Sequence, residues 1–163
     1  MAKINVLEPT IPFFFGKYNR RPLELRQAKR LAGAIGSEGN RGYAWEHMLP
    51  LFLPNADCVE SEGLIKDVTA TQNLKLLNIK DQAVTQLVFG SGQHRVAAAR
   101  MSATKIKKRI SEITSAIKKM QSGPENTLRV ATITTLEGEL AKEKAKLEEV
   151  TFWGVKAFDE SKH

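Results

Sequence analysis

The sequence predicts a mixed α/β domain that carries a long antiparallel helical hairpin just before its last strand. Three features lead to this prediction. A β-prone run at residues 84–89 breaks at two glycines and continues into an alanine-rich helix. Two apolar seams with helical spacing flank Ser122-Gly123-Pro124, and residues 151–159 return to a strand pattern. With 163 residues, we expect one small domain and an appendage rather than two large cores.

The same features divide the chain. Residues 1–102 and 151–163 are expected to form the mixed-sheet domain, and residues 103–150 an inserted coiled-coil hairpin. The domain begins with two β-prone runs, 4–7 and 11–18, in which Pro12 marks an edge strand or a strand start. The three consecutive phenylalanines of the second run are expected in the core, with stacking on nucleic-acid bases as the alternative.

A helix is predicted from about Leu23 to Ile35, because apolar residues recur there at helical spacing. Gly36 and Gly39 supply its end. Residues 49–54 then predict a buried strand bracketed by prolines, followed by an acidic loop to residue 67 that contains Cys58. A further helix is expected at about residues 69–77, leading into the strand at 84–89.

The helix that begins near Gln93 is predicted to be unusually long. Its apolar positions alternate steps of three and four over about three and a half heptads. After the break at Ser122-Gly123-Pro124, a second seam follows and is interrupted by Glu143. Two such helices with a short connection predict an antiparallel hairpin that projects on the order of 35–40 Å at 1.5 Å per residue. The seam residues are Val96, Ala99, Ala103, Ile106, Ile110, Ile113, Ile117 and Met120, then Ile133, Leu136, Leu140, Leu147 and Val150.

The hairpin seam has two interpretations. It zips upon itself, or it pairs with a second copy of the chain or another coiled coil, which would make this an interaction protein and a homodimer. The strand at 151–159 is expected to join the sheet beside the strand at 84–89, and the tail 160–163 is expected to fray.

The glycine turn is the candidate binding site. A strand, a glycine turn and a helix present free backbone N–H groups and a positive dipole end to an anion. Gly90 and Gly92 allow the backbone to approach a ligand closely, and the permanent charge and donor fork of Arg95 match phosphate. A tight turn with a solvated basic pair and no ligand is the alternative. The candidate phosphate- or nucleotide-binding residues are Gly90, Ser91, Gly92, Gln93, His94 and Arg95.

Two stretches resemble the ParB/sulfiredoxin-like family. Residues 89–98, F-G-S-G-Q-H-R-V-A-A, resemble its phosphate-binding box, in which a Gly-x-x-Arg or Gly-x-His-Arg turn precedes a helix of small residues. Asn19-Arg20-Arg21-Pro22-Leu23 and the helix after it resemble the family's opening box. The resemblance covers about the first hundred residues and implies a ParB N-terminal-like domain that binds nucleotide phosphate or nucleic-acid backbone. ATP or CTP with Mg²⁺ is the cofactor it implies.

The chain departs from the sulfiredoxins within this family. Their reductase chemistry needs a cysteine between the Gly and the His of the box, where this chain has Gln93, and Cys58 lies in a different segment. An amide cannot form the thiosulfinate intermediate, so this activity is excluded. ATP-binding sulfiredoxins also offer a Lys, a Ser and a Thr from the first helix, where this chain has Gln27, Arg30 and Ala34. The adenosine half of such a pocket therefore differs.

An ATP- or metal-dependent enzyme is the alternative function, because some relatives are free-serine kinases or nucleases. His94 is then the candidate catalytic residue, assisting proton transfer or stabilising charge in a nuclease, an NTP hydrolase or a phosphotransferase. Many of these relatives carry an acidic residue before the box glycine, where this chain has Ser91. The sequence offers no paired carboxylates that predict a metal site, so no metal ligand is assigned.

Glu125-Asn126-Thr127-Leu128-Arg129 matches the Glu-Asn-x-x-Arg string with which ParB clamps hold triphosphate and metal. It lies at the predicted hairpin tip, before the returning strand, whereas the family's string follows that strand. We therefore interpret the match as chance. The family's helix-turn-helix DNA reader would also follow later, so the chain resembles the N-terminal module alone, either a fragment of a longer protein or a minimal relative.

Charge points to a polyanionic partner. The formal net charge is +7, and two basic blocks, residues 1–41 and 94–121, flank the glycine turn. Nucleic acid, DNA above all, or a nucleotide is the expected partner, with basic helices that merely aid solubility as the alternative. No apolar run is long enough to span a membrane, and Cys58 is the sole cysteine, so an intracellular protein of cytoplasm or nucleus is expected. The supporting contacts expected are Asn19, Arg20, Arg21, Arg26, Arg30 and Arg100.

Overall fold

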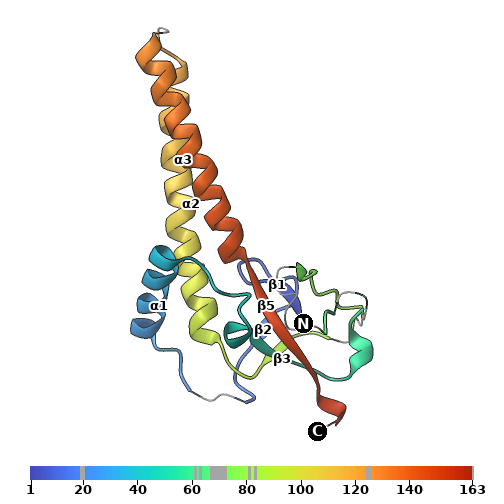
Figure 1. Cartoon of the computed structure of the whole chain (residues 1–163). Helices are drawn as coiled ribbons and strands as arrows, with labels where there is room; N and C mark the ends of the chain where they lie inside the picture. The colour runs from blue at the N-terminus through green and yellow to red at the C-terminus, as the bar shows by residue number, and fades with distance from the viewer. Residues whose placement is uncertain are drawn as a thin grey trace.

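The computed structural model describes residues 1–18, 21–60, 62, 64–66, 73–80, 82, 84–123 and 126–162. In this part of the chain, five strands form a mixed sheet, and three helices longer than one turn accompany it. Two of these helices form a long pair directly before the last strand (Figure 1). The predicted mixed α/β fold with a helical hairpin is therefore confirmed. Asn19, Arg20, Pro124, Glu125 and His163 lie outside the described residues.

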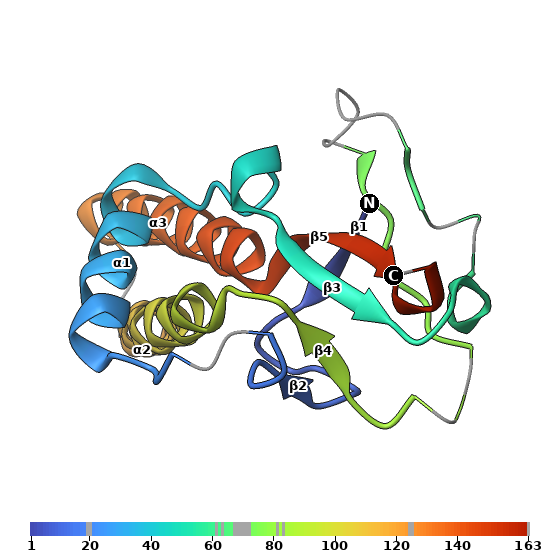
Figure 2. The same ribbon diagram turned by 90° about the horizontal axis from the view of Figure 1, so that it is seen from below.

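The strand order in the sheet is β1-β5-β3-β4-β2, and the directions alternate between antiparallel and parallel pairs. β1 is antiparallel to β5, β5 is parallel to β3, β3 is antiparallel to β4, and β4 is parallel to β2. Figure 2 shows the three helices gathered on one side of this sheet. The strands are β1 (Ala2–Asn5), β2 (Phe13–Phe14), β3 (Leu49–Leu53), β4 (Leu87–Phe89) and β5 (Phe152–Asp159).

The last strand does not lie where the sequence placed it. β5 was expected beside β4, but β3 separates the two. β5 pairs with β3 from Leu49↔Val155 to Leu53↔Asp159, and its other edge pairs with β1. Trp153, Gly154 and Val155 are all buried, as expected for a strand with neighbours on both edges. β3 is therefore the central strand, and β5 and β4 lie on either side of it, each with one edge strand beyond it.

The strand predicted over residues 11–18 shortens to the two residues of β2. Pro12 has no N–H for the ladder, but its carbonyl accepts a hydrogen bond from the N–H of Leu87 at 2.8 Å. The side chains alternate: Phe13 and Phe15 pack on buried Phe89 with ring centroids 4.9 and 5.3 Å away, while Phe14 is exposed. The expectation that all three phenylalanines are core residues is thus wrong for Phe14.

The first helix, α1 (Leu25–Glu38), is displaced toward the C-terminus from its predicted range of 23–35. Gly36 lies inside the helix, and the helix ends at Gly39, whose φ is +82° and whose N–H donates to the carbonyl of Ile35. Ala28 and Ala32 are the buried positions, so α1 packs through small side chains.

The helix expected at residues 69–77 is wrong where the chain is described; residues 69–72 lie outside the described part. Residues 75–77 instead run along β1, with backbone hydrogen bonds from Lys3 N–H to Lys75 and from Leu77 N–H to Lys3. In the loop before it, Cys58 ends a single 3₁₀ turn, η2 (Ala56–Cys58), and is fully buried in the core.

The hairpin is formed by α2 (Gln93–Gln121) and α3 (Thr127–Thr151), which lie along one another (Figure 1). Val96 and Ala99 of α2 belong to the domain core, whereas Ile113 and Ile117 are buried farther out along the hairpin. The chain itself therefore buries these seam positions, while Ile106, Ile110 and Leu140 remain partly exposed. In the described part of the chain, no helix is both long and apolar enough to cross a bilayer.

The match to Glu-Asn-x-x-Arg has a structural explanation at the hairpin tip. The Asn126 side chain caps α3 by accepting from the N–H of Arg129 at 2.8 Å. The Arg129 guanidinium donates to the carbonyl of Gly123, across the turn. Asn126 and Arg129 thus close the tip.

The end of the chain is more ordered than predicted. Residues 160–162 form a 3₁₀ turn, η5 (Glu160–Lys162), and the carboxylate of Glu160 accepts from Lys17 at 2.7 Å and from the hydroxyl of Tyr18. These contacts hold the tail against the turn that follows β2, so the prediction of fraying is wrong for residues 160–162.

The hairpin should depend on its buried seam rather than on its exposed apolar residues. Ile113 is 2% exposed and Leu128 is 79% exposed. We expect Ile113→Ala to lower the free energy of unfolding by about 2–5 kcal/mol, because it leaves a cavity between the helices. Leu128→Ala should change it by less than about 0.5 kcal/mol. Urea denaturation followed by circular dichroism measures both, and equal losses would contradict a seam closed within the chain.

Candidate phosphate-binding site

The first turn of α2 begins as the sequence predicts. Gly92 is the N-cap and adopts a φ of +104°, in the left-handed region that glycine tolerates. Among the described residues, no side chain caps this terminus. The backbone N–H groups of the first helical turn have no partner within the helix, so this end keeps its attraction for negative charge.

The two glycines are required by the protein's own packing. A Cβ at Gly90 would lie 2.7 Å from Cε2 of Phe52, and a Cβ at Gly92 would overlap Cδ2 of Leu49. Both neighbours belong to β3, which lies beside β4 in the sheet. We expected these glycines to allow close approach of a ligand, but the closest approach is that of β3. Their presence by itself therefore carries no information about a ligand.

The three side chains that follow the turn contact two different segments, the one before α1 and the one before β3. The amide of Gln93 donates to the carbonyl of Arg21, and the guanidinium of Arg95 donates through Nη1 to the carbonyl of His47 at 3.1 Å. His94 lies between them in the chain, and its Nε2 accepts from the N–H of Glu24 at 2.9 Å. Consecutive helical residues are about 100° apart around the axis, which explains the divergence. The predicted residues do not converge on one point.

His94 has a structural partner. Its Nε2 accepts a hydrogen bond from the backbone at the start of α1, so this nitrogen already has a partner. Gln93 binds the same segment through Arg21. Together they attach the chain that leads into α1 to the first turn of α2. This arrangement gives the predicted catalytic histidine a positioning role.

Arg95 lies in a different environment from its two neighbours. Its guanidinium is half-buried, and burial lowers the pKa of Arg95 below its ordinary value. Its acceptor, the carbonyl of His47, also accepts from Nε1 of Trp153 at 2.9 Å. Within the described residues, no carboxylate forms an ion pair with Arg95. A permanent positive charge is thus partly withdrawn from water and has only a shared backbone oxygen beside it.

Arg95 lines a cavity of about 270 Å³ between α1, the segment after α1, and β5. The cavity has an apolar side and a polar side, and the polar side carries a second arginine, Arg41, which is exposed. Glu38 is its acidic member. The lining residues are Leu31, Ala34, Ile35, Glu38, Gly39, Asn40, Arg41, His47, Arg95 and Trp153.

A larger cavity of about 590 Å³ adjoins this one, between α1 and the base of the hairpin. Among its charged lining residues, Lys146 pairs with Glu143 at 2.7 Å, and Arg109 pairs with Glu112 and Glu139, which lie outside the lining. Lys105, which forms no ion pair in the described part, is exposed to water. The smaller cavity therefore contains the stronger candidate for an anion site, because Arg95 is half-buried as well as without an ion pair in the described part.

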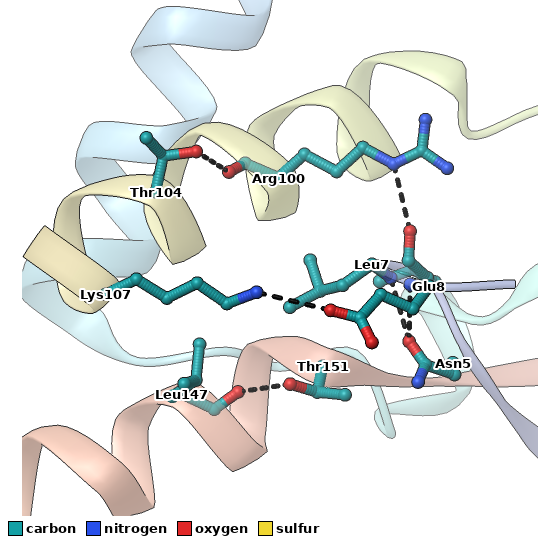
Figure 3. Close-up of polar contacts among 9 residues, drawn as sticks. Asn5, Leu7, Glu8, Arg100, Thr104, Lys107, Leu147 and Thr151 are labelled. Atoms are coloured by element: carbon teal, nitrogen blue, oxygen red, sulfur yellow. Dashed lines mark hydrogen bonds and ion pairs between the residues drawn. The ribbon is translucent and has the colours of Figure 1, made fainter.

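Of the predicted supporting residues, Arg100 makes a contact within the protein. Arg100 donates through Nε to the carbonyl of Val6 at 3.0 Å, and Lys107 pairs with Glu8 at 3.3 Å (Figure 3). The side chain of Asn5 shapes this loop by accepting from the N–H groups of Leu7 and Glu8. Arg100 therefore fastens α2 to the loop after β1, although its terminal nitrogens point away from that loop in Figure 3.

Arg26 and Arg30 lie exposed on α1, and Arg21 is exposed before it. Asn19 and Arg20 lie outside the described residues, so the opening box is described only in part. In the described part of the chain, no group of three or more His, Cys, Asp or Glu side chains is placed to hold a metal ion. The residues that sequence reasoning missed are Arg41, Asn40, His47 and Trp153, which the fold brings to Arg95.

Comparison with models of known protein families, with curated proteins and with solved structures found no match to this chain.

The conformation and packing of Gly92 predict how its substitution changes the free energy of unfolding. Gly92→Ala should lower the free energy of unfolding by about 1–3 kcal/mol through backbone strain alone, and the overlap with Leu49 should add to this. Gly138 is the matched control, because it lies within α3 and nothing lies within 4 Å of a Cβ built there. Gly138→Ala should raise stability by about 0.4–1 kcal/mol. Chemical denaturation of both variants checks the contrast, and a neutral Gly92→Ala would refute the packing explanation.

Proposed function

We propose that this chain binds the phosphate groups of a nucleotide or of a nucleic-acid backbone at the cavity lined by Arg95 and Arg41. The observation that carries the proposal is the half-buried guanidinium of Arg95, which has a backbone carbonyl as acceptor and no ion-paired carboxylate among the described residues. Withdrawing a charge from water costs free energy unless opposite charge and hydrogen bonds compensate it. A bound phosphate would supply both.

The chemistry of the lining supports a phosphate. The planar guanidinium of Arg95 presents a fork of N–H donors, of which Nη1 is bound to His47, and such forks match phosphate oxygens. Arg41 adds a permanent charge, and Asn40 lines the same cavity. The volume of about 270 Å³ lies near the lower end of the ~300–1,000 Å³ typical of ligand sites. A phosphate group would occupy part of the cavity, and the rest of the ligand would extend past the exposed Arg41.

The surroundings support a polyanionic ligand over an isolated anion. α1 lines the cavity with its second half and carries exposed Arg26, Lys29 and Arg30 in its first half. With a net charge of +7, the protein should attract polyanions at long range. The resemblance to ParB/sulfiredoxin-like phosphate-binding boxes agrees with this proposal and makes ATP and CTP, with and without Mg²⁺, the first nucleotides to test.

We do not extend the proposal to catalysis by His94. Its Nε2 accepts from the backbone N–H of Glu24, so a role in proton transfer would require this contact to break. The hairpin likewise gives no reason to place a partner on its seam, because α2 and α3 cover it for one another.

Phosphate binding should depend on both arginines. We expect ATP, CTP or inorganic triphosphate to raise the melting temperature of the wild-type protein, since a ligand that binds the native state stabilises it by mass action. Arg95→Lys should weaken binding roughly tenfold, because losing one charge-assisted, bidentate contact costs on the order of 1.5 kcal/mol. Arg41→Ala, at an exposed position, should weaken it less and leave the fold intact. Thermal shift at several ligand concentrations gives the affinities.

Lys119→Ala is the charge-matched control. Lys119 is exposed near the far end of α2, away from the cavity, and removing it also lowers the net charge by one. If the affinity falls as much in Lys119→Ala as in Arg41→Ala, the binding reflects overall charge and the site is wrongly assigned. If no phosphate-bearing probe stabilises the wild-type protein at low salt, the proposed function is wrong.

A further inference from the structure

One face of the sheet carries a row of apolar side chains that crosses four strands. Phe14 of β2 pairs with Val88 of β4, Val88 pairs with Phe52 of β3, and Phe52 pairs with Phe158 of β5. Residues paired in register project from the same face of a sheet, so these four side chains form one continuous row. The neighbouring positions along β3, β4 and β5 face the buried core instead.

The aromatic members of this face remain accessible to solvent. The exposed fractions are 41% for Phe14, 39% for Phe158, 48% for Tyr18 and 44% for Trp45. Phe52 stacks with Phe158 at a centroid distance of 5.6 Å, and Tyr18 lies over Phe52 at 4.3 Å. By contrast, Phe89 and Trp153, which lie on the opposite face, are at most 4% exposed. We call Phe14, Tyr18, Trp45, Phe52 and Phe158 the aromatic face.

Positive groups adjoin the aromatic face. Lys156 pairs in register with Pro50, one step along the strands from the row, and its Nζ lies 3.5 Å from the centroid of the Trp45 ring. Two carboxylates near the end of β5 are matched by lysines, Glu160 by Lys17 and Asp159 by Lys162. Among the described residues, Lys156 forms no ion pair, so it is available to a negative partner.

The aromatic face also reaches the start of α2. A Cβ at Gly90 would meet Phe52 and Pro50, so Gly90 lies on this face. Two residues later, Gly92 begins α2 at a terminus that no described side chain caps. The stacking surface therefore ends beside the positive end of a helix, which favours negative charge. Exposed rings, a lysine without an ion pair among the described residues and a helix N-terminus together suit a ligand with both bases and phosphates.

We propose that the aromatic face binds single-stranded nucleic acid, with bases stacked on the exposed rings of Phe14 and Phe158 and phosphates directed toward Lys156 and the start of α2. Single strands are favoured over duplexes because only unpaired bases present their flat faces to aromatic side chains. The side chains of the aromatic face do not line the Arg95 cavity, so binding at this face can be tested separately from the proposed function.

The test compares an oligo(dT) of about 12 nucleotides, within the usual size of such sites, with an abasic oligonucleotide of the same length. The two strands carry the same phosphates, but only oligo(dT) can stack. Of the two tryptophans, Trp45 belongs to the aromatic face and is 44% exposed, whereas Trp153 lines the Arg95 cavity and is 4% exposed. Quenching of tryptophan fluorescence that is lost in Trp45→Phe therefore reports on the aromatic face. We expect oligo(dT) to quench this fluorescence and to bind at least tenfold more tightly than the abasic strand.

Variants then separate stacking from charge. Phe14→Ala and Phe158→Ala, at exposed positions, should each weaken oligo(dT) binding roughly tenfold, in line with the usual effect of removing one stacking ring, and leave the abasic strand unaffected. Leu128→Ala, an exposed apolar truncation at the hairpin tip, should change neither. Arg41→Ala should weaken both strands alike if the Arg95 cavity holds phosphate, and its failure to do so would count only against that cavity.

Two results would overturn the proposal. The first is equal binding of oligo(dT) and the abasic strand, or unchanged oligo(dT) binding in both phenylalanine variants. The second comes from sedimentation of the protein alone. If the wild-type protein dimerises and Phe14→Ala and Phe158→Ala are monomeric, the aromatic face is a contact between copies of this chain.

Discussion

The insertion of β5 between β1 and β3 is the contact on which the other features of this molecule depend. It joins residues 152–159 to residues 2–5 and 49–53, which are separated from β5 by the whole hairpin. One side of the strand delivers Trp153 to the carbonyl of His47, and the other side delivers Lys156 and Phe158 to the aromatic face. β5, the last strand in the sequence, thus contributes residues to both proposed surfaces.

The His47 carbonyl connects this strand to Arg95. It accepts from both Arg95 and Trp153, so the short turn η1 (Trp45–His47) is fixed between α2 and β5. The segment before η1 is fastened independently: the N–H of Gly154 donates to the carbonyl of Gly42, and a Cβ at Gly42 would meet the ring of Trp153. Arg95 is therefore held half-buried by a packed backbone segment, and no carboxylate of the described residues pairs with it. The proposed phosphate ligand would neutralise its charge.

The sheet also shows how β-strand alternation separates the core from the aromatic face. Along β2, Phe13 faces the core and Phe14 faces outward, and along β3 the buried leucines alternate with Pro50 and Phe52. The alternation gives the sheet a core side that needs apolar volume and an outer side that no packing requirement forces to be aromatic. Rings that remain exposed on that outer side are therefore informative about binding.

The elements that could be predicted from the sequence are those with local signals. Helical spacing and a stop glycine located α1 to within three residues, and the apolar seams with the break at Ser122-Gly123 located the hairpin. The turn of Gly90 and Gly92 was also correctly placed before α2. These features depend on backbone preference and on side-chain periodicity within about one turn or one strand, which a single stretch of sequence contains.

Which of these elements pair with and contact one another could not be predicted from local patterns, because it depends on the packing of the whole fold. Period-two alternation identifies β5 as a strand but contains nothing that selects β3 over β4 as its neighbour. The directions of Gln93, His94 and Arg95 follow from helix geometry only once their acceptors are in place, and His47 lies 48 residues before Arg95 and 106 before Trp153. Pairings over such distances are fixed by the packing of the whole core, so a local pattern could name Arg95 as a candidate but could not place it in its cavity.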